Sequence, residues 1–235
     1  MKGHPVRMRV SLAPAVGVLF VTVTLIGGCF RLSQPAPQVR SYRLDYRPPA
    51  VTDTTLPVIL RVATLAVAAI YDRESIAYRR GEYSTAFDFY NRWSANPGSM
   101  LADLLARDLG ASGAYRAVQR SPSLLRSDYQ LSGEVEAIEE RITDGACSAH
   151  LQVRVLLVRV IPGAGDALAL QQTYSADKPC TCGDTAALAA AMSEALRTIS
   201  VQLQHGVYDA IRAELSRAGA DMVGAGGVLG PDSVD

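Results

Sequence analysis

The sequence predicts an α/β protein in which one mixed β-sheet is covered by two main helices. Three observations lead to this class. Several segments alternate apolar and polar residues, most clearly over 129–137. Two segments, 96–110 and 185–217, repeat apolar residues every three or four positions between helix caps. The hydrophobic content of 49% with 20% charged residues is typical of a folded globular chain.

The first 28 residues have the pattern of a secretory signal peptide. A basic stretch, Lys2 to Arg9, precedes an apolar run from Val10 to Ile26, the order expected of an export signal. The run closes with Gly27-Gly28-Cys29, which resembles the bacterial lipobox, whose cysteine is acylated, for example with palmitate, and becomes the new N-terminus. An uncleaved membrane helix is the alternative, although about 17 residues is the lower limit for crossing a bilayer. We predict a lipid anchor on Cys29.

The remaining chain divides into a tether, one domain and a tail. Residues 29–40 are polar and contain Pro35 and Pro37, which suits a flexible connection. Removing the signal leaves about 205 of the 235 residues, enough for one sizeable core, and we place a single domain at 41–217. Residues 218–235 are Gly-rich and acidic, so we expect this tail to be disordered.

Strand signals run along most of the domain. The apolar run 58–70 is rich in β-branched residues and predicts a central strand, although its alanines would also suit a helix. Pro162-Gly163 separates two long strands and predicts a hairpin. Glu134 and Glu136 share the wet face of their strand, where solvation explains them better than catalysis. The expected strands are 41–46, 58–70, two within 75–93 around Arg80-Gly81, 115–119, 129–137, 147–160 and 167–175.

Two helices have clear start and stop signals. The first begins with Asn96 as N-cap and Pro97 at the first helical position, and it ends at Gly110. The second is capped by Asp184 and runs to about Arg217. Its apolar residues fall on one face, which must pack on a sheet. These residues are Leu188, Met192, Leu196, Ile199, Leu203, Val207, Ile211 and Leu215.

The hairpin geometry predicts one disulfide. Exported proteins fold in an oxidising compartment, so the cysteines beyond the anchor are disulfide candidates. If Val160 faces Ala167 across the turn, opposed residues have a constant sum and Cys147 faces Cys180. A bulge or a shifted register would select Cys182 instead. We therefore predict a bridge from Cys147, with Cys180 preferred and Cys182 as the alternative.

Few residues suit catalysis or cofactor binding. After the signal the only histidines are His150 and His205, and the sequence has no nucleophile elbow, zinc-protease motif or phosphate loop. A zinc site from His150 and the three cysteines is a weaker alternative to the disulfide, because it needs thiolates in a reducing setting. The formal net charge of zero leaves no excess of basic residues for nucleic acid. We expect no enzyme, cofactor, metal or nucleic-acid partner.

The segment 76–100 combines large aromatic residues with arginines. Both kinds are enriched at protein interfaces, so we predict that this segment binds a partner protein. In the alternative, the rings close one end of the sheet as core and the arginines stack over them. The predicted partner-binding residues are Tyr78, Arg79, Tyr83, Tyr90, Arg92 and Trp93.

This part of the sequence resembles the ABC-type transport auxiliary lipoprotein family, which includes the PqiC-type proteins. The resemblance rests on the lipobox and on the order Ile76, Tyr78-Arg79, Tyr83, Tyr90, Arg92-Trp93 and Pro97 opening a Leu-rich helix. It implies a three-layer sandwich with a mixed sheet between helices. It also implies a non-catalytic periplasmic lipoprotein that works with an ABC permease, its ATPase and an Mce-domain protein to move lipids between membranes. The Cys180-Thr181-Cys182 pair and the Gly-rich tail depart from the family pattern.

We therefore expect an auxiliary subunit of an ABC/Mce lipid transport system, tethered to a membrane and acting by docking. Phe30 follows the lipidated cysteine where an Asp would resemble an inner-membrane retention signal, so we expect the outer membrane, facing the periplasm. A ring-like homo-oligomer is compatible with this role. The alternative function is an outer-membrane assembly or envelope-scaffold lipoprotein.

Overall fold

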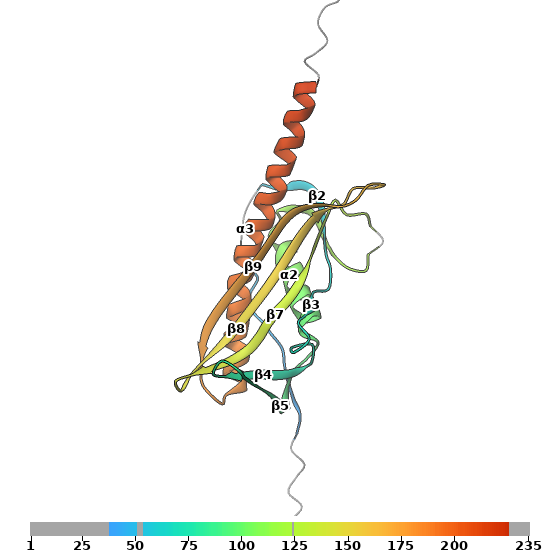
Figure 1. The fold of residues 1–235 in the computed structure, drawn as a ribbon. Helices are drawn as coiled ribbons and strands as arrows, with labels where there is room; N and C mark the ends of the chain where they lie inside the picture. Colours follow the sequence, from blue (N-terminus) through green and yellow to red (C-terminus); the bar gives the residue numbers. More distant parts are fainter. Residues whose placement is uncertain (1–37, 51–53, 124, 226–235) are drawn as a thin grey trace, which may run out of the picture. The chain divides into compact units, whose positions relative to one another are not determined.

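The computed structural model describes residues 38–50, 54–123 and 125–225. The predicted lipidation site Cys29 and residues 226–235 of the predicted tail lie outside this part. A mixed sheet of nine strands with two helices confirms the predicted α/β class (Figure 1). The helices of the described ranges are α2 (Pro97–Ala111) and α3 (Thr185–Ala225). The strands are β1 (Arg40–Tyr42), β2 (Leu56–Val62), β3 (Ala66–Val67), β4 (Ser75–Arg80), β5 (Ser84–Trp93), β6 (Tyr115–Arg120), β7 (Tyr129–Thr143), β8 (Ala146–Arg159) and β9 (Ala167–Cys180).

Strand β7 organises the sheet because both of its edges are paired. On one edge it pairs antiparallel with β8 along its whole length, and β8 pairs antiparallel with β9. On the other edge it pairs parallel with β2, then β3, then β4. Strand β6 extends the sheet beyond β2, while β5 and β1 extend it beyond β4. Because β4 joins near the C-terminal end of β7, strands β4, β5 and β1 lie together at one end of the sheet.

Both helices begin at the predicted caps. The Asn96 side chain accepts a hydrogen bond from the Gly98 backbone N–H at 2.9 Å, and Pro97 occupies the first turn. Asp184 accepts from the backbone N–H groups of Ala186 and Ala187 at 2.9 and 3.1 Å. These side chains satisfy amide donors that have no partner within the helix. Local sequence therefore defines both helix starts.

The two helices lie side by side on one face of the sheet. The resemblance implied instead a sheet between helices. Figure 1 shows both behind strands β7 to β9, and they contact each other through Asp108 of α2 and Ser200 of α3. Alternation explains this arrangement, because β2 and β8 each bury one set of alternate side chains. The predicted stripe of α3 is buried from Leu188 to Ile211.

A buried carboxylate joins the N-terminal segment to both helices. Asp108 is fully buried and accepts hydrogen bonds from Tyr46 Oη and Ser200 Oγ, both at 2.6 Å. Arg107 pairs with the same carboxylate at 2.8 Å, and its guanidinium lies 4.6 Å from the centroid of the Tyr46 ring. Since Leu44 and Tyr46 are drawn into the helix layer, the strand expected at 41–46 ends at Tyr42.

The apolar run 58–70 is an interrupted strand. It leaves the sheet between β2 and β3, but Ala63 N still donates to Leu131 O at 2.8 Å. The first turn of α2 packs against this interruption. A Cβ on Gly98 would lie 2.1 Å from the Leu65 carbonyl oxygen and 2.9 Å from Val67 Cγ2. The close approach of α2 is therefore possible only because residue 98 is glycine.

The face of the sheet opposite the helices carries a buried polar cluster. Glu139 is 1% exposed and accepts hydrogen bonds from Tyr71 Oη at 2.5 Å and from Arg141 Nε at 3.0 Å. It also forms an ion pair with Arg79, whose Nε lies 2.9 Å from Glu139 Oε1. Beside it His150 is 3% exposed, and its Nδ1 lies 2.9 Å from Asp177 Oδ1. Burial lowers the pKa of His150, although the hydrogen bond with Asp177 opposes this shift.

Cys147 and Cys180 are paired across strands β8 and β9, as predicted, but the pairing next to the turn differs from the predicted one. Arg159, not Val160, pairs with Ala167. An extra residue in β9 between Leu168 and Leu170 then restores the expected register along the rest of the hairpin.

The disulfide itself joins Cys147 to Cys182, with Cα atoms 5.2 Å apart, so the preferred partner Cys180 was wrong and the alternative was correct. Strand β9 ends at Cys180, and the following turn, with Gly183 at φ 75°, brings Cys182 Sγ to 3.5 Å from the Gly145 carbonyl oxygen. Cys180 is a free thiol 4.0 Å from Glu140 Oε1, and burial and this carboxyl group raise its pKa.

Helix α3 continues past its predicted end at Arg217, as far as Ala225. A single glycine within a helix costs only about 1 kcal/mol relative to alanine, so Gly219 does not end it. In Figure 1 this last part of α3 extends beyond the sheet, and Leu215, at the end of the predicted stripe, is 36% exposed. No helix in the described ranges has an apolar stretch long enough to cross a bilayer.

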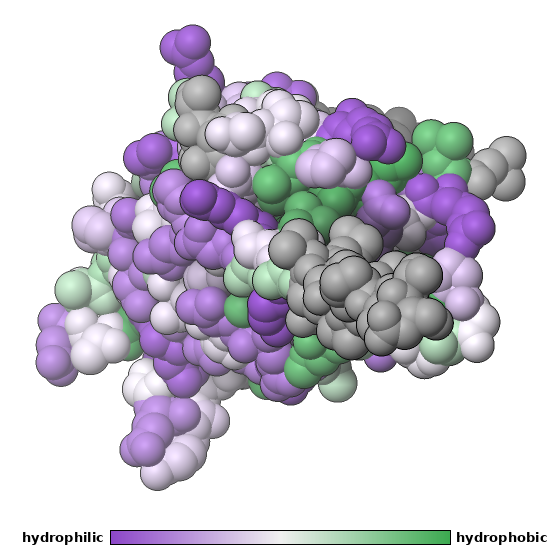
Figure 2. Space-filling model, turned by 90° about the horizontal axis from the view of Figure 1, so that it is seen from above, coloured by the Kyte–Doolittle hydropathy of each residue, from purple (hydrophilic) through white to green (hydrophobic). Residues whose placement is uncertain are grey.

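The view from above, along the direction in which α3 projects, shows a largely hydrophilic surface (Figure 2). Hydrophobic residues gather in one area of this face, while the apolar residues of the sheet and helices lie mainly in the core between the two layers. This face is therefore mainly polar, with local apolar areas.

Replacing Gly98 by alanine should destabilise the domain. Its Cβ would meet the Leu65 carbonyl at 2.1 Å, and overpacking of this kind costs about 1–3 kcal/mol. Gly110 in the same helix is the matched control, because its Cβ would meet only Val118, at 3.9 Å. Gly110→Ala should be neutral or stabilising by about 0.5–1 kcal/mol. Urea denaturation that ranks Gly98→Ala as the more stable variant would contradict this packing.

Acidification should weaken folding through His150. Because its folded pKa is lowered, the unfolded chain binds this proton at a higher pH than the folded chain. This contribution to stability is full above the ordinary pKa of 6.5 and is lost as the pH falls through the window below it. His150→Gln should flatten the pH dependence of the unfolding free energy there, whereas His205→Gln, on the exposed side of α3, should keep the wild-type slope. Equal slopes in all three proteins would refute the assignment.

Loss of the Cys147–Cys182 bridge should cost about 2–4 kcal/mol of unfolding free energy. The comparison is between Cys180→Ser, which keeps the bridge, and Cys180→Ser/Cys182→Ser, which leaves Cys147 without a partner. Denaturation under non-reducing conditions measures the difference. A difference below about 1 kcal/mol, or a peptide map that joins Cys147 to Cys180, would show that the bridge is assigned wrongly.

Candidate functional site

The candidate site is the β4–β5 hairpin, which contains the predicted partner-binding residues. Strand β4 pairs with β7 on its inner side and β5 lies next to it, so the hairpin is held rigidly at the end of the sheet. The turn at 81–83 joins the two strands as predicted, with Gly81 at φ 67°. The site is thus built on strands and not on a long loop.

Three of the six predicted residues are engaged within the domain. Tyr78 donates a hydrogen bond from its hydroxyl to Asp88, and Arg79 pairs with Glu139 at 2.9 Å. Trp93 is only 2% exposed and belongs to the core, so its predicted place on a partner surface is wrong. The reason is that β1 pairs with the end of β5 and places Tyr42 beside Trp93, which closes this end of the core.

The other three predicted residues are on the surface. Tyr83, in the turn, is 91% exposed, and Tyr90 is 48% exposed. Arg92 is exposed as well. The hairpin therefore places two tyrosines and an arginine in solvent, while its tryptophan secures it to the core.

Strand β5 contains a bulge that the sequence pattern did not predict. Ser75 pairs with Arg92 but Ala77 pairs with Phe87, so four residues of β5, 88–91, lie opposite the single residue Ile76 of β4, and we call them the β5 bulge. The Asp88 side chain organises it, because Oδ1 accepts from the backbone N–H groups of Tyr90 and Asn91 at 2.7 and 2.9 Å. Burial alone would raise the pKa of Asp88, but these hydrogen bonds and the one from Tyr78 hold it below its ordinary value.

The β5 bulge exposes an aromatic pair. Phe89 is 82% exposed, and its ring centroid lies 6.3 Å from that of Tyr90. Phe89 was not among the predicted residues, because strand alternation alone would place it with Phe87. The signal that could have found it is Asp88 followed by Asn91, since Asp commonly bonds the backbone two residues further on and starts a turn.

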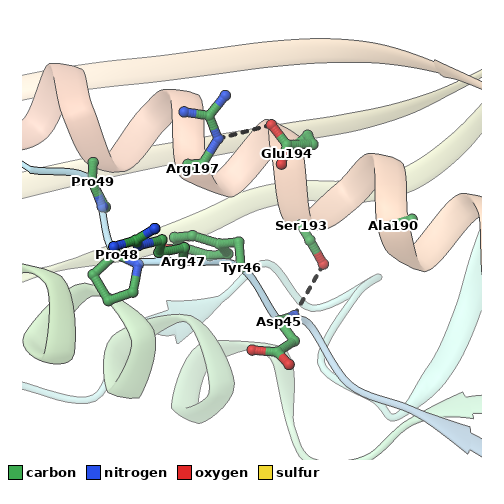
Figure 3. A pocket seen from close by; sticks show the side chains of 9 residues that line it. All are labelled: Asp45, Tyr46, Arg47, Pro48, Pro49, Ala190, Ser193, Glu194 and Arg197. Carbon is green, nitrogen blue, oxygen red and sulfur yellow. Dashed lines mark hydrogen bonds and ion pairs between the residues drawn. The ribbon is translucent and has the colours of Figure 1, made fainter.

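A second candidate is a groove of about 510 Å³ between the N-terminal segment and α3 (Figure 3). Asp45 to Pro49 form one wall, and Ala190, Ser193, Glu194 and Arg197 form the other. Ser193 Oγ accepts from the Asp45 backbone N–H at 3.1 Å, and Arg197 pairs with Glu194 at 2.8 Å. Charges of both signs are present and no histidine or cysteine lines the groove, so the lining residues provide no nucleophile with a neighbouring imidazole base.

The weighed zinc site is not supported. The bond between Cys147 and Cys182 removes two of its four ligands, and His150 is hydrogen-bonded to Asp177. Within the described ranges no group of three or more His, Cys, Asp or Glu side chains is placed to hold a metal ion. The exposed part of the hairpin includes the aromatic side chains of Tyr83, Phe89 and Tyr90 and the basic side chains of Arg80 and Arg92.

Solved structures share this fold. A crystal structure of a Xanthomonas campestris protein of family DUF330 aligns with a TM-score of 0.63 at 24% identity, covering 77% of this chain and 97% of that one. A crystal structure of an uncharacterized protein aligns with a TM-score of 0.52 at 16% identity, covering 68% and 99%. At these identities the likeness shows the fold alone. No curated protein matches this sequence.

A family model matches most of the domain. It is that of the ABC-type transport auxiliary lipoprotein component, and it covers residues 42–204, from the end of β1 into α3. The match includes the β4–β5 hairpin, the β5 bulge and the whole β7–β9 part of the sheet. The chain therefore belongs to the family of ABC-type transport auxiliary lipoprotein components.

Proposed function

We propose that this protein is a non-catalytic, lipid-anchored subunit of an ABC/Mce-type lipid transport system, and that it docks onto the Mce or permease component through the β4–β5 hairpin. The observation that carries the proposal is the exposure of Tyr83, which is 91% accessible at the turn of a rigid hairpin. A large amphipathic ring held in solvent by strands is a typical interface anchor.

Family membership and the N-terminal sequence support this role. The family is a transport auxiliary component, and a lipoprotein family implies a place in the cell envelope. In the proposal Cys29 is the acylated residue, and Phe30 in the next position favours the outer membrane, with the domain in the periplasm. The same arrangement is compatible with a ring-like homo-oligomer around the Mce component.

The surroundings of Tyr83 suit a docking contact. Arg80 precedes the turn, Glu82 lies within it, and both are exposed, so the tip has charges of both signs around one aromatic ring. Since Arg79 pairs with Glu139 and Tyr78 with Asp88, both strands behind the tip are held in place. A partner would therefore meet a preorganised surface and would lose little conformational entropy on binding.

Replacing Tyr83 by serine should weaken the transporter complex. Truncating a central interface residue costs about 2 kcal/mol or more, which is roughly thirtyfold in Kd. Co-purification with a tagged permease or Mce protein from solubilised membranes measures the effect. Leu168→Ser is the matched control, because Leu168 is also a large exposed apolar residue, at 57%, but lies on β9 at the other end of the sheet.

Recovery of transporter subunits at the wild-type level with Tyr83→Ser would overturn the docking surface. Recovery of an outer-membrane barrel instead of transporter subunits, with the wild-type protein, would favour the assembly or scaffold role over transport.

A further inference from the structure

The β5 bulge lies where the chain enters the domain. Strand β1 pairs parallel with β5, and its first residue, Arg40, pairs with Asn91 at the end of the bulge. The preceding residue, Val39, is 53% exposed. Val39 therefore directly precedes the residue that pairs with the end of the bulge, so three exposed apolar or aromatic side chains, Val39, Phe89 and Tyr90, belong to the entry point.

The length of the tether limits how far this entry point can be from a membrane. Cys29 and Gln38 are separated by 38 − 29 = 9 residues, and an extended chain spans at most about 3.6 Å per residue. If Cys29 is acylated, Gln38 lies within about 32 Å of the lipid surface, and Arg40, which pairs with the end of the β5 bulge, lies within about 40 Å. Of the described domain, the end that carries β5 and β1 is the one that the anchor restrains (Figure 1).

The side chains at this end have the chemistry of a membrane interface. Tyrosine is enriched at the level of lipid headgroups, because its ring is apolar and its hydroxyl polar, and Phe89 adds a fully apolar ring beside Tyr90. Arg40 and Arg92 are exposed next to the pair, so they can contact lipid phosphates. Arg43 is offset by its exposed pairing with Asp45 at 3.7 Å and adds less.

We propose that the β5 bulge rests on the surface of the membrane that holds the lipid anchor, with Phe89 and Tyr90 at the interface and Arg40 and Arg92 at the phosphates. This inference rests on the proposed function only through the anchor at Cys29. It assigns to the hairpin two separate contacts. Tyr83 lies six positions before Phe89, or about 20 Å along an extended strand, so the turn remains available to a protein while the bulge contacts lipid.

Asp88 holds the β5 bulge in the conformation that this contact needs. Its carboxylate bonds two backbone amides of the bulge, the Asn91 side chain and the Tyr78 hydroxyl. Two exposed rings would otherwise tend to turn back onto the sheet, because burying apolar area is favourable. The bulge keeps them directed outward at the entry point.

The test uses the full mature lipoprotein in vesicles of phosphatidylethanolamine and phosphatidylglycerol that contain a photoactivatable phospholipid. After irradiation, mass spectrometry maps lipid adducts, and the intact mass reports acylation of Cys29. Adducts should concentrate on peptides that cover 38–43 and 84–93, with little on the peptide that contains Leu168. Phe89→Ser/Tyr90→Ser should lower the adducts on 38–43 several-fold, whereas Leu168→Ser should leave them unchanged.

The possible results of this experiment test the membrane contact of the bulge separately from the lipid anchor and from the docking of the hairpin to a protein. Acylated protein without adducts over 38–43 and 84–93 would overturn the membrane contact while leaving the anchor and docking intact. A chemical cross-linker applied to native membranes that joins these peptides to a transporter subunit, when the vesicles give no lipid adducts on them, would overturn it in favour of a protein contact. A mass without acyl chains would overturn the anchor and the bulge contact together.

Discussion

Backbone hydrogen bonding along both edges of β7 holds this domain together. One edge is fully used by β8, and the other is divided among β2, β3 and β4, so three separate segments must pair in sequence along a single strand. Because buried amide and carbonyl groups need partners, none of these segments can shift without leaving some of them unpaired. The β4–β5 hairpin takes its place at the end of the sheet from this constraint.

The second constraint is the buried carboxylate of Asp108. It accepts hydrogen bonds from Tyr46 and Ser200 and pairs with Arg107, so it connects the N-terminal segment, α2 and α3. A buried charge is tolerated only when it is paired and hydrogen-bonded. This network therefore fixes how the two helices and the segment after β1 lie relative to one another on one face of the sheet.

These two constraints meet at the hairpin. The pairing of β4 with β7 holds one side of it, and β1, which leads into the Tyr46 segment, pairs with the other. Trp93 fills the core between them, while Asp88 directs Phe89 and Tyr90 outward. The result is a rigid element with a tip at Tyr83 and an aromatic pair at the chain entry, which suits a subunit that acts by contact.

The sequence by itself determined what neighbouring residues control. Asn96 and Asp184 start the helices because their side chains bond amides two or three residues away. Only the tertiary structure decided that Cys147 bonds to Cys182, that both helices share one face, and that Trp93 is buried while Phe89 is exposed. These features depend on a turn, a bulge and contacts between segments that are distant in the sequence. The alternation of apolar and polar residues along one strand contains no information on them.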